Sequence, residues 1–478
     1  QKKILFVTSE CSHFASTGGL AEVAGSLPKA IAKASKSFKV KVVMPLYKKI
    51  SETFKDELKF VGEGKISLSW RDSYVGVFTM KYDGIEYYFI DNKYYFNRDN
   101  LYGHYDDGER FAYFSKSIFK LMEIIDFYPD IIHTNDWQTA LVSIYLDILY
   151  KKEGLYTNIK SVFTIHNIEY QGIFDLSFLE DVIGIGSKYQ EILEYNGLIN
   201  LMKGAIVCAD VVTTVSPRYS REIATNSYAH GLEHIIRINK GKIIGILNGI
   251  NVESYDPATD KEIYENFDIE SFDKKVENKL ALQKDLGLEV NPNKCLMVVI
   301  SRLATHKGID ILLESLQGFL DLGVQFVCLG TGLEEYQNAF LKLSYERSSE
   351  VKALITFDNS LSRKLYAASD LFVMPSKSEP CGLSQMIASR YGSVPIVRAT
   401  GGLFDTITDY CDNGNGFVFK DYSSSALYEK GKEAINLYYQ KNNEFKEVAK
   451  KAMAKDFSWN ASSKQYIEMY NNLLKKEK

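Results

Sequence analysis

Short apolar runs recur along the whole chain, and longer amphipathic stretches separate them. The first series covers residues 3–9, 39–45, 130–135, 161–167, 210–216 and 242–248, and the second covers residues 295–301, 324–330, 353–358, 371–376 and 394–399. Runs of this length, rich in Val, Ile and Phe, are typical of parallel strands whose two faces are covered by helices. Two series in one chain predict an α/β fold with two doubly wound domains.

The domain boundary is expected where the first series ends. Gly249 closes the last strand of that series, and a polar segment and a charged helix follow it. We predict an N-terminal domain over residues 1–248 and a C-terminal domain over residues 249–455. Apolar residues at helical spacing predict a final helix over residues 456–478, with Trp459 as its anchor.

Residues 64–91 depart from the parallel pattern. The strand-like runs KISLSW, YVGVFTMKY and IEYYFID lie here, and Asp83-Gly84 separates the last two. Asp-Gly is a preferred two-residue turn between antiparallel strands. The stretch therefore predicts an antiparallel hairpin added to the first domain.

Charge and cysteine content limit the classes of partner. The 478 residues include 57 basic and 61 acidic side chains, for a net charge of -4, so nucleic acid and anionic membranes are not expected partners. No apolar run approaches the roughly 18–20 residues of a membrane helix. The six cysteines are scattered without a CxxC pair. They predict neither a zinc site nor a disulfide framework, and a reducing cytoplasm is the expected location.

A pair of glycines follows the first predicted strand. Gly18 and Gly19 stand between the run KILFVTS and an apolar helix, where the carboxyl ends of parallel strands bind ligands. Backbone N–H groups there can approach an anion such as phosphate, although a tight turn that binds nothing explains the pair equally well. Residues 399–407, ATGGLFDTI, repeat Thr-Gly-Gly-Leu in the second domain. Two copies favour a ligand held by two facing domains.

Three charged residues of the second domain follow predicted strands. Arg302 and Lys307 lie in SRLATHKG, and together they could neutralise a diphosphate; the alternative is a pair of solvated surface cations. Glu379 precedes Pro380 and Gly382, which would hold its carboxylate rigidly at a ligand. The alternative for Glu379 is an ordinary loop glutamate.

Two strands of the first domain also end in polar side chains. His166 closes SVFTIHN, with Asn167 after it, and an imidazole there can bind a sugar hydroxyl or steady developing charge. Asp136 follows another strand, and its neighbour Trp137 suits either the core or a ligand platform. The alternative is that His166 lies at the domain edge, makes its hydrogen bonds within the protein and binds no ligand.

Taken together, these motifs resemble the bacterial glycogen synthases and plant starch synthases. The resemblance rests on STGGLAEV, HTNDWQTA, TIHNIEYQGIF, ILNGI, SRLATHKG, EPCGLSQM and ATGGLFDT, which run along nearly the whole chain. It implies a GT-B fold, in which two Rossmann-like domains face across a deep cleft and a C-terminal helix crosses back to the first domain. It also implies transfer of glucose from ADP-glucose to the 4-hydroxyl at the non-reducing end of an α-1,4-glucan, with retention of configuration and without a metal ion.

The resemblance assigns roles to individual residues. The catalytic set that it implies is Glu379, His166, Arg302 and Lys307, with Glu379 beside the donor glucose and the two cations on the donor diphosphate. The donor-binding set is Ser16, Thr17, Gly18, Gly19, Asn248, Arg302, Lys307, Cys381, Gly382, Leu383, Thr400, Gly401 and Gly402. Asp136, Asn167, Tyr95 and Phe96 are candidates for the cleft or the glucan acceptor.

This sequence departs from the family pattern at the first Gly-Gly motif. Ser16 stands where the family usually has a lysine that touches the donor phosphate, and Glu22 stands where it usually has Asp. Loss of such a cation removes roughly 3 kcal/mol of transition-state stabilisation unless it is replaced. Lys203 or Arg398 could replace it, the preferred donor could be UDP-glucose, or the chain could be a slow enzyme or a non-catalytic glucan-binding homologue.

Two further alternatives stay open at this point. A different GT-B enzyme, such as a glucan phosphorylase or a sucrose-type synthase, shares the general architecture, although no pyridoxal-type lysine motif stands out. The stretch over residues 93–114 is dense in Tyr and Phe. Its rings either stack on glucose units of the acceptor or pack under a loop.

Overall fold

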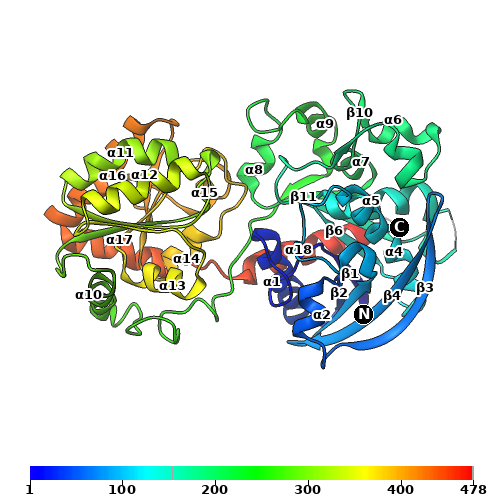
Figure 1. The fold of residues 1–478 in the computed structure, drawn as a ribbon, viewed down its shortest axis with the longest axis horizontal. Coiled ribbons are helices and arrows are strands. Elements are labelled where there is room, and N and C mark those ends of the chain that lie inside the picture. The colour runs from blue at the N-terminus through cyan, green and yellow to red at the C-terminus, as the bar shows by residue number, and fades with distance from the viewer. Residues whose placement is uncertain (153, 476–478) are drawn as a thin grey trace. The chain divides into compact units, whose positions relative to one another are not determined.

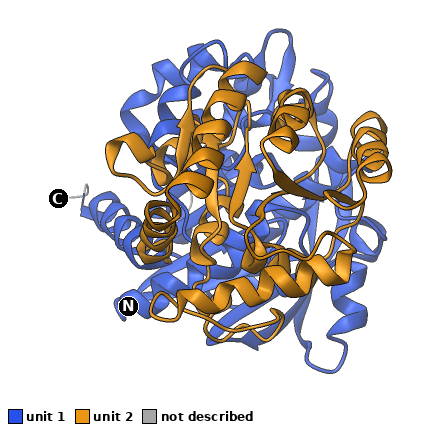
Figure 2. Cartoon of the chain, turned by 90° about the vertical axis from the view of Figure 1, so that its left-hand side faces the viewer, with its two compact units in different colours: residues 1–249, 459–478 blue, residues 250–458 orange. Residues whose placement is uncertain are grey.

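The computed structural model describes residues 1–152 and 154–475. The chain divides into two compact units (Figure 2). Unit 1 contains residues 1–249 and 459–478, and unit 2 contains residues 250–458. Each unit has its own β-sheet, so each is described separately.

Unit 1 is built on a nine-stranded sheet with the order β12-β11-β7-β6-β1-β2-β5-β4-β3. Its strands are β1 (Lys2–Val7), β2 (Phe38–Pro45), β3 (Lys59–Leu68), β4 (Arg71–Tyr82), β5 (Ile85–Asp91), β6 (Ile131–Asn135), β7 (Lys160–Ile165), β11 (Val211–Thr214) and β12 (Ile243–Gly245). The strands β12, β11, β7, β6, β1, β2 and β5 pair in parallel. A small sheet contains β8 (Ile173–Phe174), β10 (Leu198–Asn200) and β9 (Glu194–Tyr195).

The predicted antiparallel addition is present at one edge of this sheet. β4 pairs antiparallel with both β3 and β5. Asp83 and Gly84 form the tight turn before β5 with φ angles of 50° and 82°. Positive φ at both central residues is what a type I′ hairpin turn requires, and Asp and Gly tolerate it.

Helices cover both faces of the unit 1 sheet. They are α1 (Gly19–Ala34), α2 (Lys48–Thr53), α3 (Lys93–Phe96), α4 (Asp107–Ile124), α5 (Trp137–Tyr145), α6 (Gln190–Leu193), α7 (Leu201–Cys208), α8 (Pro217–Glu222), α9 (Glu233–Ile238) and α18 (Trp459–Lys475). The final helix α18 packs against α1, and Trp459 is buried. The Tyr470 hydroxyl lies 2.6 Å from His133 Nδ1 on β6, which ties the end of the chain to the sheet.

Unit 2 is built on a six-stranded parallel sheet with the order β15-β14-β13-β16-β17-β18. Its strands are β13 (Cys295–Ile300), β14 (Val324–Leu329), β15 (Val351–Leu354), β16 (Leu371–Met374), β17 (Val394–Arg398) and β18 (Phe417–Phe419). The strands are mostly buried, as expected for a parallel sheet covered on two faces, whereas three of the four residues of the edge strand β15 are half-buried. This strand order is the one found in doubly wound dinucleotide-binding folds.

The helices of unit 2 form two layers around its sheet. They are α10 (Lys275–Leu286), α11 (Ile309–Asp321), α12 (Glu334–Glu346), α13 (Asn359–Ala368), α14 (Ser384–Arg390), α15 (Gly401–Thr406), α16 (Ser424–Gln440) and α17 (Asn442–Ala454). Figure 1 shows α11, α12 and α16 on one face and α13, α14 and α17 on the other. The sequence prediction of α/β architecture with two doubly wound sheets is confirmed.

Candidate functional site

Strand order indicates where each unit can bind a ligand. In a doubly wound sheet, ligands bind outside the carboxyl ends of the two strands at which the order reverses. In unit 2 these strands are β13 and β16, which pair in parallel. Arg302 and Lys307 follow β13, and Glu379 follows β16. The topology therefore gathers the three charged residues that the sequence singled out.

An ion pair joins two of these residues. Lys307 Nζ lies 2.9 Å from Glu379 Oε2 and 3.2 Å from Oε1. The Ser376 hydroxyl donates to the same Oε2 at 3.0 Å, and the Glu379 side chain is only 8% exposed. Since both carboxylate oxygens accept hydrogen bonds from fixed donors, Glu379 is held in one orientation.

A close approach of two loops positions Lys307. Gly308 has a φ of 76°, and a Cβ at this position would lie 2.0 Å from the carbonyl oxygen of Pro375. Only glycine lets the loop after β13 lie directly on the loop after β16. Arg302, in contrast, is exposed, and its guanidinium has no hydrogen bond or ion pair within the described part of the chain. It is therefore available to an anion.

The second Gly-Gly motif supports the loop that carries Glu379. Gly401 has a φ of 45°, and a Cβ there would lie 1.7 Å from the carbonyl oxygen of Glu379. A Cβ at Gly402 would lie 2.0 Å from the carbonyl oxygen of Cys381, and the Gly402 N–H donates to Glu379 O at 3.1 Å. Thr400 is the buried N-cap residue of α15. Glycine is therefore required at both positions, because any side chain there would clash with the backbone of the loop that carries Glu379.

The rest of that loop leads directly into α14. Gly382 has a φ of 80°, and a Cβ there would meet Gln385 Oε1 at 2.6 Å. Leu383 is the N-cap residue of the helix, and Cys381 is buried with its carbonyl oxygen accepting from Gln385 Nε2 at 3.0 Å. The turn EPCGL is thus held by the Gly402 backbone on one side and by the Gln385 side chain on the other.

The first Gly-Gly motif has a different environment. It lies in unit 1 after β1, and the order of that sheet reverses between β1 and β6. Ser16, Thr17, Gly18 and Gly19 are all exposed, and a Cβ at either glycine would have no neighbour within 4 Å. Gly18 has a φ of -171°, an extended conformation that any residue adopts. Neither strain nor packing in the structure accounts for these two glycines.

A buried carboxylate, Glu10, holds this open turn in place. Glu10 Oε2 accepts from the Thr17 N–H at 2.6 Å and from the Thr17 hydroxyl at 2.8 Å. Burial raises the Glu10 pKa, and the bonds from Thr17 oppose that shift. Glu10 was not among the residues predicted from the sequence, although an acidic residue directly after an apolar strand is a signal that could have revealed it.

Asp136 and His166 lie together at the same edge of unit 1. Asp136 follows β6, and its Oδ1 accepts from the backbone N–H of His166 at 2.8 Å. Its φ of 58° is unusual for a residue with a side chain, and such strain is often found at functional sites. Burial raises the Asp136 pKa to about 7. The structure thus brings together two of the predicted residues.

His166 is a neutral imidazole in this environment. Burial lowers its pKa to about 3. Asn135 Nδ2 donates to Val7 O, so Asn135 Oδ1 is the acceptor that faces His166 Nε2 at 2.9 Å. Nε2 therefore carries the proton, and Nδ1 is left as an acceptor. The adjacent Asn167 is half-buried and accepts from the Glu169 N–H at 3.0 Å.

Asn248 is buried just after β12. Within the described residues, its side-chain Oδ1 has no hydrogen-bond partner. A buried polar atom of this kind costs free energy unless something else satisfies it. It agrees with the prediction that Asn248 meets a ligand.

Two of the acceptor candidates are corrected by the structure. Tyr95 and Phe96 are 3% and 0% exposed. Tyr95 stacks on Tyr113 at 4.7 Å and donates its hydroxyl to Glu109 at 2.6 Å. Because neither ring has a free face, neither can stack on a sugar. For Tyr95 and Phe96, the structure therefore supports the alternative that these rings pack inside the protein.

The two cations considered as replacements at Ser16 are engaged elsewhere. Lys203 Nζ donates to Glu191 O and Glu194 O, both at 2.7 Å. Arg398 donates to Lys377 O at 2.8 Å and to Lys420 O at 3.0 Å. Carbonyl oxygens of each residue's own unit thus hold both groups, and neither substitutes for the missing lysine in this structure.

Phe357 is a second residue that sequence reasoning missed. It is 93% exposed in the loop after β15, at the carboxyl edge that also carries Arg302. Exposed aromatic rings at such an edge offer a face to a planar base. Its signal in the sequence was only its position as the last residue of the run ALITF.

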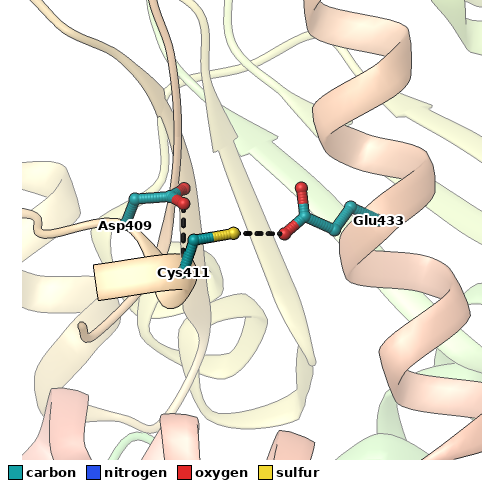
Figure 3. A group of neighbouring side chains, drawn as sticks. All are labelled: Asp409, Cys411 and Glu433. Atoms are coloured by element: carbon teal, nitrogen blue, oxygen red, sulfur yellow. Dashed lines mark hydrogen bonds between the residues drawn. The ribbon is translucent and has the colours of Figure 1, made fainter. Parts of the chain in front are cut away.

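A separate polar cluster in unit 2 has the composition of a metal site (Figure 3). It consists of Asp409, Cys411 and Glu433, whose candidate ligand atoms lie within 4.8 Å of one another. Lys430 already occupies the acidic side, 3.2 Å from Asp409 and 2.9 Å from Glu433. The Cys411 thiol donates to Glu433, and this bond raises its pKa to about 11. The Lys430 ammonium pairs with both carboxylates and the protonated Cys411 thiol donates to one of them, so the contacts within the cluster are explained without an ion.

Comparisons with known proteins identify the family of the chain. The starch synthase catalytic domain matches residues 3–238, and the group 1 glycosyl transferase domain matches residues 283–452. The chain is 43% identical over 480 residues to a glycogen synthase of Clostridioides difficile (strain 630), covering 98% of this chain and 99% of that protein. A glycogen synthase of Bacillus licheniformis is 44% identical over 481 residues, covering 99% of each chain.

Solved structures show the same relationship. The catalytic domain of starch synthase IV from Arabidopsis thaliana, bound to ADP and acarbose, superposes with a TM-score of 0.89 and 34% identity over 99% of each chain. A sucrose-phosphate synthase from Thermosynechococcus elongatus, at 15% identity, a TM-score of 0.61 and 99% of each chain, shares the fold alone. The fold is that of the GT-B glycosyltransferases. The chain belongs to the family of bacterial glycogen synthases and starch synthases, and it is a glucosyltransferase that builds glucan from nucleotide-sugar glucose.

No described helix has the length and apolar character that spanning a bilayer requires.

Proposed function

We propose that the protein transfers glucose from ADP-glucose to the 4-hydroxyl at the non-reducing end of an α-1,4-glucan, with retention of configuration. The observation that carries this proposal is the group formed by Arg302, Lys307 and Glu379 at the strand-order reversal of unit 2. Breaking the bond between glucose C1 and the diphosphate oxygen leaves extra negative charge on the diphosphate. Fixed cations stabilise that charge more in the transition state than in the ground state.

Each charged residue has a distinct part in this scheme. The exposed guanidinium of Arg302 binds the diphosphate through its fork of N–H groups. Lys307 contributes a point charge and orients Glu379. The Glu379 carboxylate steadies the positive charge that develops at the anomeric carbon. The acceptor 4-hydroxyl forms the new bond to C1, and its proton leaves with the diphosphate.

The residues of unit 1 are proposed to bind the donor glucose and the glucan acceptor. The open turn of Ser16, Thr17, Gly18 and Gly19 offers backbone N–H groups at the start of the long helix α1, where the helix dipole favours an anion. His166 offers a neutral imidazole to a sugar hydroxyl, and Asp136 fixes the backbone beside it. These side chains and backbone groups are proposed to act without a metal ion or other cofactor.

The donor nucleotide is proposed to stack on Phe357, whose ring is almost fully exposed. A Phe357→Ala variant then has a higher KM for ADP-glucose, by about tenfold, with a smaller change in kcat. A Tyr345→Ala variant is the control, because Tyr345 is also an exposed ring of unit 2 but lies on α12. Equal donor KM values for both variants would remove Phe357 from the site.

Transfer of radiolabelled glucose into glycogen tests the proposal directly. ADP-glucose and UDP-glucose are supplied in parallel to the wild type and to a Glu379→Ala variant. The proposal expects incorporation with ADP-glucose at a higher kcat/KM than with UDP-glucose, and almost none with the variant. Higher efficiency with UDP-glucose would reverse the donor assignment. Retention of glycogen without incorporation from either donor would instead indicate a non-catalytic glucan-binding protein.

A further inference from the structure

The turn of unit 2 that carries Lys307 is short. Lys307 is the last residue of the single-turn 3₁₀ helix Thr305–Lys307, which lies between β13 and α11. Its N–H donates to Ala304 O at 3.1 Å, and the Gly308 N–H donates to Thr305 O at 3.0 Å. A single turn of this kind has few hydrogen bonds of its own and poor hydrogen-bond geometry. Contacts from neighbouring loops therefore decide where the turn lies.

A tyrosine of a different loop, Tyr422, binds to this turn. It lies between β18 and α16 and is half-buried. Its hydroxyl donates to Oδ1 of Asp310, in the first turn of α11, at 2.6 Å and lies 3.3 Å from Thr305 O. Burial and the bond to Asp310 raise the pKa of Tyr422, so the phenol keeps its proton and stays a donor. One hydroxyl thus contacts a residue before Lys307 and a residue after it.

The start of the turn is anchored by other groups. The hydroxyl of Tyr336, a buried residue of α12, lies 3.1 Å from Thr305 Oγ1. The Leu303 N–H donates to Thr331 O in the loop after β14 at 2.8 Å. These contacts do not involve Tyr422. Loss of the Tyr422 hydroxyl is therefore expected to loosen the end of the turn and to leave its start in place.

Two cations lie over the ring of Tyr422 and connect it to further loops. Lys377 Nζ lies 5.6 Å from the ring centroid, and the guanidinium carbon of Arg398 lies 5.7 Å from it. Arg398 donates to Lys377 O and to Lys420 O. The Lys377 N–H donates to His306 O at 2.9 Å, inside the turn itself. The ends of β16, β17 and β18 therefore meet the turn after β13 around one aromatic ring.

The ammonium of Lys307 has narrow geometric limits. A lysine carries a point charge on a flexible stem, so its position depends on where its backbone is held. Lys307 Nζ lies 2.9 and 3.2 Å from the two carboxylate oxygens of Glu379. In the proposed reaction it must stay beside this carboxylate and also reach the leaving diphosphate. A displacement of about 1 Å at an active site can lower a rate by about 10²-fold.

We propose that Tyr422 is a positioning residue for glucose transfer: its hydroxyl holds the turn that carries Lys307 and keeps the Lys307 ammonium where the donor diphosphate departs. The inference rests on the proposed function, which gives Lys307 its role. Tyr422 acts through Lys307 and has no contact with the substrate in this scheme. Because negative charge grows on the diphosphate as its bond to glucose breaks, loss of the hydroxyl should lower kcat more than it raises the donor KM.

A double-mutant cycle between Tyr422 and Lys307 tests the inference. Tyr422→Phe, Lys307→Met and the double variant are assayed for transfer from ADP-glucose to glycogen, and their affinity for ADP is measured by calorimetry. Tyr422→Phe should lower kcat about tenfold and raise the donor KM less than about threefold. In the Lys307→Met background, the same substitution should change kcat less than about twofold. The dissociation constant of ADP should follow this pattern, with an increase that disappears when Lys307 is absent.

Tyr264→Phe is the matched control for loss of a bond between tyrosine and aspartate. Tyr264 is also a half-buried residue of unit 2, and its hydroxyl donates to Asp285 Oδ2 on α10 at 2.6 Å. The thermal midpoint of each variant measures its loss of stability, which is expected for both tyrosines. A lower kcat is expected only for Tyr422→Phe. An equal loss of kcat in Tyr264→Phe would overturn the inference.

The remaining outcomes separate this inference from the proposed function. An equal effect of Tyr422→Phe with and without Lys307 would overturn the inference and show that the hydroxyl is only structural. Absence of transfer by the wild type from either nucleotide sugar would refute the proposed function, yet coupling of the two residues in ADP binding would still support the positioning role. Unchanged kcat and ADP affinity in Lys307→Met would overturn the inference, while transfer by that variant would leave the overall reaction intact.

Discussion

The two Thr-Gly-Gly-Leu turns have the same sequence but opposite surroundings. In unit 2, a Cβ at Gly401 or Gly402 would lie within 2.0 Å of a backbone carbonyl oxygen of the Glu379 loop. In unit 1, a Cβ at Gly18 or Gly19 would meet nothing within 4 Å. The second turn is glycine because the protein itself lies against it. The first turn has no such internal reason, which leaves close approach of a ligand as its physical explanation.

This contrast also explains how the charged groups are arranged. The packed turn supports Glu379, whose carboxylate is fixed by Lys307 and Ser376. The open turn is supported from behind by Glu10, which binds Thr17. One turn therefore positions a side chain, while the other presents its own backbone.

The largest expected effect is on the side chain that the packed turn supports. A Glu379→Gln variant keeps the size of the residue but removes its charge, so kcat for glucose transfer should fall about 10²–10³-fold. Ser376→Ala is the matched control, because it removes one hydrogen bond to the carboxylate and leaves the charge. Steady-state kinetics with ADP-glucose measures both. Near-normal turnover by Glu379→Gln would refute the assigned role.

The packed turn should be intolerant of any side chain. Gly401→Ala introduces a Cβ 1.7 Å from Glu379 O at a φ of 45°, so we expect a loss of about 2–4 kcal/mol in the free energy of unfolding. Urea unfolding of the full chain measures this loss. Gly287→Ala is a control for positive φ alone, since its φ is 69° and its Cβ would have no neighbour. A loss in Gly401→Ala no larger than in this control would show that the contact with the Glu379 loop is unimportant.

Restoring the lysine of the family pattern should change catalysis at the open turn. Ser16→Lys adds an ammonium to an exposed turn that presents backbone N–H groups, and we expect kcat/KM to rise about tenfold with at least one of the two nucleotide sugars. Ser187→Lys adds the same charge at another exposed position of unit 1 and serves as the control. If Ser16→Lys matches this control with both donors, residue 16 lies outside the donor site.

The open turn should tolerate a methyl group in folding but not in binding. Gly19→Ala has space for its Cβ and places a better helix former in the first turn of α1, so the free energy of unfolding should be unchanged or slightly higher. The KM for the donor should rise several-fold, because the methyl group occupies the space of the ligand. Thermal unfolding and donor titration are compared on the same preparation. A clear loss of stability would show that the turn is packed after all.

A further expected effect is the pH dependence of stability from Asp136. Its pKa is raised to about 7, so the folded protein holds this proton more tightly than the unfolded chain does. The stability linked to this proton is present in acid and decreases as the pH rises toward about 7. Asp136→Asn should flatten this decrease in urea unfolding between about pH 4 and 7, whereas the exposed Asp72→Asn should not. Parallel profiles for wild type and Asp136→Asn would contradict the burial of this carboxyl group.

The sequence was sufficient to predict the fold and to select charged residues that the structure places close together. Buried parallel strands can be recognised in a sequence as apolar runs. Residues that directly follow such strands lie close together where the strand order reverses. This is how Arg302, Lys307, Glu379, Asp136 and His166 could be selected. Their placement follows from the topology of the two sheets.

Other features could not be predicted because they depend on packing. Nothing local distinguishes Tyr94 from Tyr95, yet the first is 66% exposed and the second 3%. The two Gly-Gly turns have the same local sequence, and only the structure shows that the chain packs against the second turn and not against the first. The position of Glu10 after an apolar strand could have marked it as a candidate, but its bond to Thr17 follows only from the turn that the structure shows.

The most direct test of the central claim is a crystal structure of the protein with bound ADP. The account predicts that the diphosphate oxygens lie within hydrogen-bond distance of the Arg302 guanidinium and the Lys307 ammonium, with the carbonyl of Glu379 still against Gly401. A diphosphate bound out of reach of both cations would contradict it.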